Sequence, residues 1–222
     1  MNKLYTYRGW ILGALAILML LLPGVPMSRG WLYCLPMLAL GLLIFAAIRV
    51  QARRVIGEHT RGFTHDADRL VTEGIYSRIR HPLYLSNWGI GMMLIVLHLG
   101  KSWWAILFIV VLYYFEKLLS KMEDRYLEKR FGDEWRQWAA VTPAFSGSGK
   151  RKKKAATLPP EKICGEPVAP LPPESAGARP PRSFWAAARA DISTWFWLAF
   201  AITLIILRKT VLDFNILELL GC

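Results

Sequence analysis

The sequence has 222 residues, of which 54% are hydrophobic and ten are tryptophan, and its mean hydropathy is +0.29. This apolar content excludes a disordered chain, three cysteines are too few for a disulfide-rich miniprotein, and the glycines follow no collagen-like period. The net charge of +12 is interrupted by long apolar segments, which is typical of oriented membrane proteins rather than of nucleic-acid-binding proteins.

Three segments without Asp, Glu, Lys or Arg are long enough to cross a bilayer. Residues 9–27, 30–48 and 82–100 have 19 residues each, or about 28 Å as helix. A fourth apolar segment, 102–115, returns across the membrane and continues as a helix beyond it. We therefore predict an all-α, polytopic membrane helix bundle with four spans in two hairpins. The first span is too long for the core of a cleaved signal peptide, which is the alternative interpretation.

Positive charge collects on one side of these spans. Seven arginines lie between the second and third spans and five basic residues occupy 150–154, whereas the opposite loops hold only Arg29 and Lys101. By the positive-inside rule, the N-terminus and the arginine-rich loop lie in the cytoplasm. We expect an integral membrane protein of a bacterial inner membrane.

The composition divides the chain into four parts. Residues 1–48 form the first hairpin, and 49–145 form a core with a cytoplasmic loop, the second hairpin and cytoplasmic helices. Residues 146–182 hold eight of the thirteen prolines and are predicted to be a basic, semi-extended linker. In the last part, 183–222, the apolar segment 192–207 predicts a fifth helix, transmembrane or interfacial, whose Arg208 and Lys209 would lie on the side opposite the other cations.

The first segment with chemical information, residues 74–87, reads GIYSRIRHPLYLSN. Pro82 suits the first turn of a helix, so His81 should be extended just outside it, with Tyr84 in that turn. The free N–H groups of a helix N-terminus favour a carboxylate, and this predicts an anion site at the cytoplasmic boundary. The alternative is an interfacial belt of basic and aromatic side chains, which alone would explain Tyr76, Arg78, Arg80 and Tyr84.

The second segment is acidic and lies on the fourth helix. Glu116 and Glu123 are seven residues apart on one helix face, and Asp124 adjoins Glu123. The short hairpin makes the third and fourth helices antiparallel neighbours, so Glu123 and Asp124 should face the anion site at His81. Glu116, near the end of a span, can simply extend into water. Gly132 predicts a helix stop.

The predicted site would attract an anion at His81 and a cation at Glu123 and Asp124, with aromatic rings between them. Such a site suits S-adenosylmethionine, which carries a carboxylate, an ammonium and a sulfonium. The physical pattern permits this cofactor without identifying it. The segments GIYSRIRHPLYLSN and KMEDRYLEKRFGDEWRQWAAVTP resemble the catalytic core of the isoprenylcysteine carboxyl methyltransferase family and the related membrane phospholipid methyltransferases, over about residues 70–145.

The family pattern is Arg-His-Pro-x-Tyr-x-Gly, a hydrophobic hairpin, Glu-Glu, Phe-Gly, two aromatic residues and a proline. Three departures from it stand out: Ser86 replaces the motif glycine, Asp124 replaces the second glutamate, and the Asn-Pro of the isoprenylcysteine enzymes is absent near His98. The third departure weakens the inference that this protein acts on the same substrate as the eukaryotic enzymes. The matching residues are Arg80, His81, Pro82, Tyr84, Glu123, Phe131, Gly132, Trp135, Trp138 and Pro143.

The resemblance implies an S-adenosylmethionine-dependent methyltransferase with a cytoplasmic cofactor pocket and a tunnel that opens to the lipid. It implies Arg80 and Glu123 as catalytic residues, with Arg80 holding a carboxylate of the acceptor or cofactor, and Asp124 supporting Glu123. The cofactor-binding residues are Tyr76, His81, Tyr84, Glu123 and Asp124. The expected partners are membrane lipids and a lipophilic small-molecule or lipid substrate. The group that accepts the methyl is a carboxylate, an amine or a thiol. No nucleic-acid partner is expected.

Two other functions fit the same residues. One is a phospholipid N-methyltransferase; the other is a non-catalytic membrane scaffold whose basic run 150–154 binds anionic lipid. Gly89 and Gly91 resemble the start of a dinucleotide-binding motif, but inside a span they favour close helix packing instead. The histidines form no pair with metal-ligand spacing, so we predict no metal site. The sequence does not define the oligomeric state.

Overall fold

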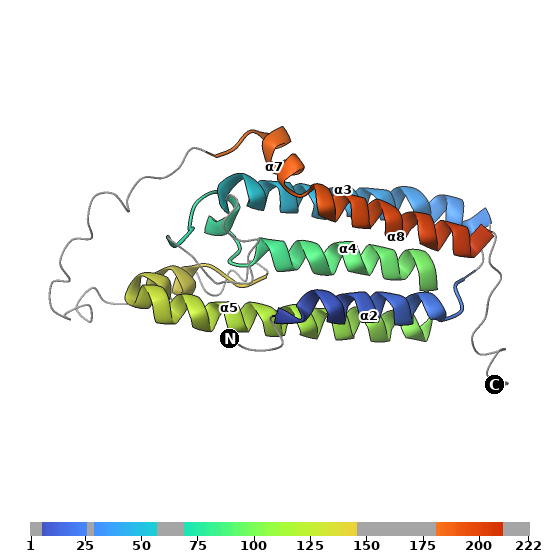
Figure 1. Cartoon of the computed structure of the whole chain (residues 1–222), viewed down its shortest axis with the longest axis horizontal. Coiled ribbons are helices and arrows are strands. Elements are labelled where there is room, and N and C mark those ends of the chain that lie inside the picture. The colour runs from blue at the N-terminus through green and yellow to red at the C-terminus, as the bar shows by residue number, and fades with distance from the viewer. Residues whose placement is uncertain (1–5, 26–28, 57–68, 146–180, 211–222) are drawn as a thin grey trace, which may run out of the picture.

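The computed structural model describes residues 6–25, 29–56, 69–145 and 181–210. Every regular element in these ranges is helical, which confirms the predicted all-α bundle. Figure 1 shows the long helices lying side by side along one axis. The elements are α2 (Arg8–Leu21), α3 (Arg29–Ile56), the 3-10 helix η1 (Gly74–Ser77), α4 (Pro82–Leu99), α5 (Trp103–Val141), α7 (Phe184–Ala190) and α8 (Ile192–Thr210).

Four helices of the described residues are long and apolar enough to cross a bilayer: α3 over Tyr33–Ile56, then α4, α5 and α8. The chain is therefore an integral membrane protein. The segment predicted as a fifth, transmembrane or interfacial helix forms α8, which is of bilayer length and contacts α4.

The first predicted span is shorter as a helix than expected, because α2 ends at Leu21. The chain turns there, and the N–H of Val25 donates to the carbonyl of His98 at 3.0 Å. At this end Arg208 donates to the Leu22 carbonyl at 2.9 Å, and Lys209 donates to the Val25 carbonyl. Backbone carbonyls of the α2–α3 turn thus stabilise the two cations at the end opposite the arginine-rich one.

Helix α3 continues to Ile56, beyond the predicted end of the span at residue 48. Arg49 and Arg53, expected in the following loop, are instead buried in the last turns of the helix. They are four residues apart, so they lie on one helix face. Both donate to one carboxylate oxygen of Asp191, at 2.9 and 3.0 Å. The buried ion pairs explain why the polar end of α3 remains helical inside the protein.

Helices α3 and α4 pack closely because a glycine stands between them. A Cβ added to Gly89 would lie 2.2 Å from the ring of Phe45 on α3. The hydroxyl of Ser86 donates to the Phe45 carbonyl at 2.8 Å, in the same contact. A Cβ added to Gly91 would likewise lie 2.4 Å from the Leu112 side chain of α5. The prediction that these glycines serve helix packing is confirmed.

Helix α5 breaks at Gly132, where the predicted stop occurs. Gly132 has φ 54° and ψ −120°, which a residue with a Cβ adopts only with strain. The last turns of α5 fold back beyond this kink (Figure 1). The chain then reaches the start of α4, where the carbonyls of Pro143 and Ala144 accept hydrogen bonds from Arg80 and His81.

Candidate functional site

The backbone around His81, at the start of α4, is held by the segment that follows α5. His81 is the residue before α4, with φ −123° and ψ 59°. Its N–H donates to the Ala144 carbonyl at 3.1 Å, and the N–H of Arg80 donates to the Pro143 carbonyl at 2.9 Å. The segment after α5 therefore fixes the two residues that precede α4.

A charged cluster joins this segment to α5. The imidazole Nε2 of His81 lies 2.9 Å from Asp124 Oδ1, and the Arg80 guanidinium donates to the same oxygen at 3.2 Å. The other ring nitrogen of His81 lies 4.0 Å from a carboxylate oxygen of Glu123. The structure thus brings together the two motifs that the sequence placed on neighbouring helices, although the role of each residue stays a prediction.

Burial differs sharply between the members of this cluster. The side chains of Arg80 and His81 are buried, whereas the Glu123 side chain is 29% exposed. The Arg80 guanidinium also lies over the Trp135 ring, 5.4 Å from its centroid, beyond the kink at Gly132. Glu123 is therefore the cluster's most accessible carboxylate, while Arg80 is held between an acid and an aromatic face.

Aromatic rings continue from the cluster between α4 and α5. The ring centroids of His81 and Tyr84 are 5.7 Å apart, and those of His81 and Phe145 are 6.2 Å apart. Tyr113 of α5 extends the row, 6.4 Å from Phe145. Such faces attract a cation, so the row supplies the aromatic component that the sequence expected beside the charges.

Tyr76 lies on η1 with its side chain buried. Its carbonyl accepts from the Trp138 indole at 3.3 Å, and its hydroxyl has no hydrogen-bond partner among the described residues. Burial, and then the negative charge of Glu123, raise the pKa of this hydroxyl far above its ordinary value, against the opposing effect of Arg53 and Arg49. The hydroxyl therefore stays protonated and can donate a hydrogen bond.

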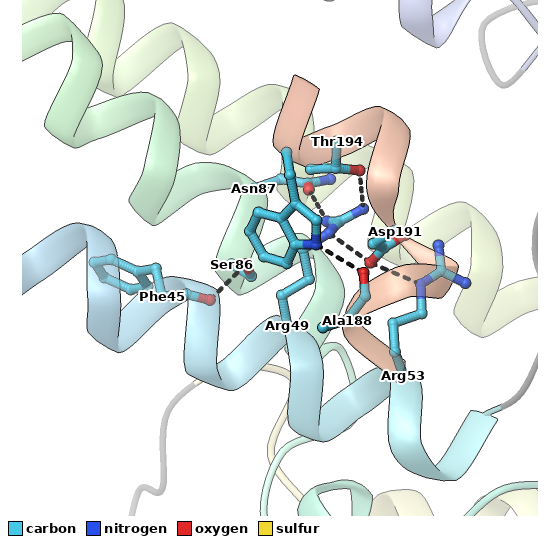
Figure 2. A network of polar contacts seen from close by, with 9 residues as sticks. Phe45, Arg49, Arg53, Ser86, Asn87, Ala188, Asp191 and Thr194 are labelled. Atoms are coloured by element: carbon cyan, nitrogen blue, oxygen red, sulfur yellow. Dashed lines mark hydrogen bonds and ion pairs between the residues drawn. The ribbon is translucent and has the colours of Figure 1, made fainter. Parts of the chain in front are cut away.

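A second polar cluster, shown in Figure 2, joins α3, α4 and the α7–α8 junction and includes residues that the sequence analysis did not select. Asp191, 2% exposed, binds Arg49 and Arg53. Arg49 also donates to Asn87 of α4 at 2.6 Å and to Thr194 of α8 at 3.2 Å. The paired arginines, one helical turn apart at the end of a span, were the signal available in the sequence. Asp191 offered none, because it is remote in sequence.

Glu116 does not reach water, and the expectation that it could is wrong. The residue is 1% exposed, on the face of α5 that packs inside the bundle. Its polar neighbours include Asn87 and Arg49. No described residue makes a hydrogen bond of good geometry to either carboxylate oxygen.

Comparison with known proteins shows what these residues are similar to. The family model described as phospholipid methyltransferase matches residues 33–134, from α3 through most of α5. The Protein-S-isoprenylcysteine O-methyltransferase of Schizosaccharomyces pombe is 30% identical over 109 residues, which are 48% of this chain. The chain spans 45% of that relative's length. No solved structure gives a significant match. The matched residues 33–134 include every predicted site residue, and this similarity agrees with the family resemblance seen in the sequence.

Proposed function

We propose that this protein is an S-adenosylmethionine-dependent methyltransferase that acts on a lipophilic acceptor from the bilayer and is similar to the isoprenylcysteine carboxyl methyltransferases. The observation that carries the proposal is the cluster of Arg80, His81, Glu123 and Asp124 where α4 begins beside α5. It lies within the segment that matches the methyltransferase family.

The residues present fit the proposed cofactor. Arg80 and His81 hold the carboxylate of Asp124 in this structure, so their chemistry suits the cofactor carboxylate. Glu123, partly exposed, can accept hydrogen bonds from an ammonium or from ribose hydroxyls. The buried Tyr76 hydroxyl can donate one further hydrogen bond, and the rings of Tyr84 and Phe145 suit a sulfonium. When bound, the cofactor supplies a methyl group activated by positive sulfur.

The chain's own contribution is alignment and the exclusion of water. Methyl transfer from a sulfonium requires no covalent nucleophile from the protein, provided that the reacting groups are held in line. The buried ion pairs of Arg80 and His81 fix the polar side of such a site. The outer faces of the helices carry exposed apolar side chains that suit lipid, including Leu40, Leu43, Ile106, Val110, Phe196 and Phe200.

We propose that this site faces the cytoplasm. Arg49, Arg53, Arg54 and Arg80 lie at the same end of the bundle, where α3 ends and α4 begins, and the positive-inside rule places that end in the cytoplasm. A bacterial inner membrane remains the prediction for the compartment.

Calorimetric titration of the purified full chain with S-adenosylmethionine tests the proposal. Wild-type protein should bind, and His81→Ala and Glu123→Gln should each lower the affinity by about tenfold or more, because each removes a charge-assisted contact. Glu134→Gln, an exposed substitution on the same helix, serves as the control and should bind as wild type. Absence of binding by wild-type protein would refute the proposal.

A non-catalytic scaffold gives a different result in the same experiment. It would bind anionic vesicles through residues 150–154 and would show no cofactor binding. Replacement of these five basic residues by glutamine should leave cofactor affinity unchanged if the cluster at His81 is the site. A phospholipid N-methyltransferase is the second candidate, because the matching family model is named for phospholipid methyltransferases. Mass analysis of lipids from cells fed labelled methionine would separate the two enzymes.

A further inference from the structure

A lysine lies beside the aromatic row that leads to the proposed cofactor residues. The ammonium of Lys117 lies over the rings of Tyr113 and Tyr114, 5.6 and 5.9 Å from their centroids. Tyr113 belongs to the row, since its ring lies 5.9 Å from that of Trp88 on α4 and 6.4 Å from that of Phe145. Tyr114 is 60% exposed. Lys117 therefore lies where the row meets the outer surface of the bundle.

The depth of Lys117 in the bundle makes its charge costly. Lys117 follows Trp103, the first residue of α5, by 14 residues, or about 21 Å along the helix, whereas the hydrocarbon core of a bilayer is about 30 Å thick. A cation at this depth is stabilised by reaching the lipid head groups, by aromatic faces or by a bound anion. The two tyrosine rings supply only the second of these contributions.

No acidic residue lies one helical turn from Lys117 on α5. The residues three and four positions away from it are Tyr113, Tyr114, Ser120 and Lys121. Glu116 is buried inside the bundle, and Asp124 is bound to the two cationic residues that precede α4. Lys121 adds a second, exposed cation, and like charges four residues apart on a helix repel each other. An anion bound between the two ammonium groups would offset this repulsion.

We propose that Lys117 and Lys121 form an anion subsite, which binds the negatively charged group of a lipophilic acceptor at the outer edge of the contact between α4 and α5. The anion is a carboxylate or a phosphate, and its apolar chain would contact the exposed side chains of Tyr114 and Leu118. The acceptor role rests on the proposed function, whereas anion binding by the two lysines does not. Both lysines determine specificity, and neither takes part in the methyl transfer itself.

The aromatic row favours the acceptor over a surrounding phospholipid as the occupant. The row continues from Tyr113 through Phe145 to His81, with 6.4 and 6.2 Å between successive ring centroids. An anion at Lys117 is therefore joined by a line of rings to the proposed cofactor residues. S-adenosylmethionine carries one net positive charge, so the bound cofactor would attract such an anion. A phospholipid held only on the outer face would be indifferent to the cofactor.

Three probes of equal chain length test the subsite: dodecanoate, dodecyl phosphate and uncharged dodecanol. Each is added to the purified full chain in an uncharged detergent, and the rise in thermal midpoint with concentration gives its affinity. We expect wild-type protein to bind at least one anionic probe about tenfold more tightly than dodecanol, and the tighter anion identifies the charged group. The double variant Lys117→Gln, Lys121→Gln should lose this preference. Lys129→Gln, an exposed change on the same helix, should keep it.

A second measurement separates the acceptor role from the binding of surrounding lipid. Sinefungin, an unreactive analogue that retains the positive charge of the cofactor, should raise the affinity for the anionic probe about threefold. S-adenosylhomocysteine, whose net charge is zero, should not raise it. An affinity that does not respond to sinefungin would overturn the acceptor role.

Equal affinity for the three probes in wild-type protein, or an anion preference that the double variant retains, would overturn the subsite. The second result is expected if the basic run 150–154 attracts the anions instead. Cofactor affinity is measured on the same samples, and it should be unchanged in the double variant, which also shows that the variant folds. Wild-type protein that binds the anionic probes but no cofactor would refute the proposed function instead, so the two failures are distinguishable.

Discussion

The imidazole of His81 lies 2.9 Å from the carboxylate of Asp124, which joins the start of α4 to the middle of α5. Arg80 shares the same carboxylate oxygen at 3.2 Å. One acidic side chain therefore positions both Arg80 and His81 at the proposed cofactor site.

Replacement of Asp124 by asparagine should weaken cofactor binding. The amide retains the size of the side chain but loses the charge that holds Arg80 and His81, so we expect about a tenfold loss of S-adenosylmethionine affinity in calorimetry. Asp133→Asn, an exposed substitution on the same helix, should have no effect. Wild-type affinity in Asp124→Asn would show that this contact does not organise the site.

Gly132→Ala should strain the kink of α5. The position has φ 54° and ψ −120°, and an added Cβ meets no atom within 4 Å, so the cost comes from the backbone alone, about 1–3 kcal/mol. Because the kink directs Trp135 and Trp138 toward Arg80 and Tyr76, cofactor affinity should fall along with thermal stability. Gly13→Ala, in open space at ordinary helical φ, is the matched control. Equal stability of the two variants would contradict this account.

Gly89→Ala should separate α3 from α4. The new methyl would lie 2.2 Å from the Phe45 ring, too close for any real contact, and overpacking of this kind costs about 1–3 kcal/mol. We expect a lower thermal midpoint in detergent, again compared with Gly13→Ala. A Phe45→Leu change in the same chain should recover part of the loss, and failure of that rescue would place the strain elsewhere.

Asp191→Asn should destabilise the attachment of α7 and α8 to the core. The substitution leaves Arg49 and Arg53 buried without their common carboxylate, which costs about 3–5 kcal/mol in comparable buried pairs. The thermal midpoint should fall, and protease cleavage near residue 182 should become faster. Asp133→Asn should leave both measurements unchanged, because its ion pair with Arg136 is exposed. Unaltered stability in Asp191→Asn would show that apolar contacts alone hold α8.

Much of the site could be predicted from the sequence, because its signals are local. Pro82 marks the start of α4 and Gly132 marks the break in α5, since each residue has a backbone property that only one kind of position tolerates. The short hairpin between the two helices makes them antiparallel neighbours. Those facts sufficed to bring His81 close to Glu123 and Asp124, as the structure has them.

The cluster of Arg49, Arg53 and Asp191 depended on the tertiary structure. Asp191 lies 142 residues from Arg49 in sequence, and no pattern along the chain indicates which buried charge pairs with which. The same holds for Glu116, whose position near a span's end is compatible with water or with the bundle interior. Helix periodicity places a side chain on a face, but only the packing of α3, α4, α5 and α8 decides whether that face meets lipid, solvent or another charge.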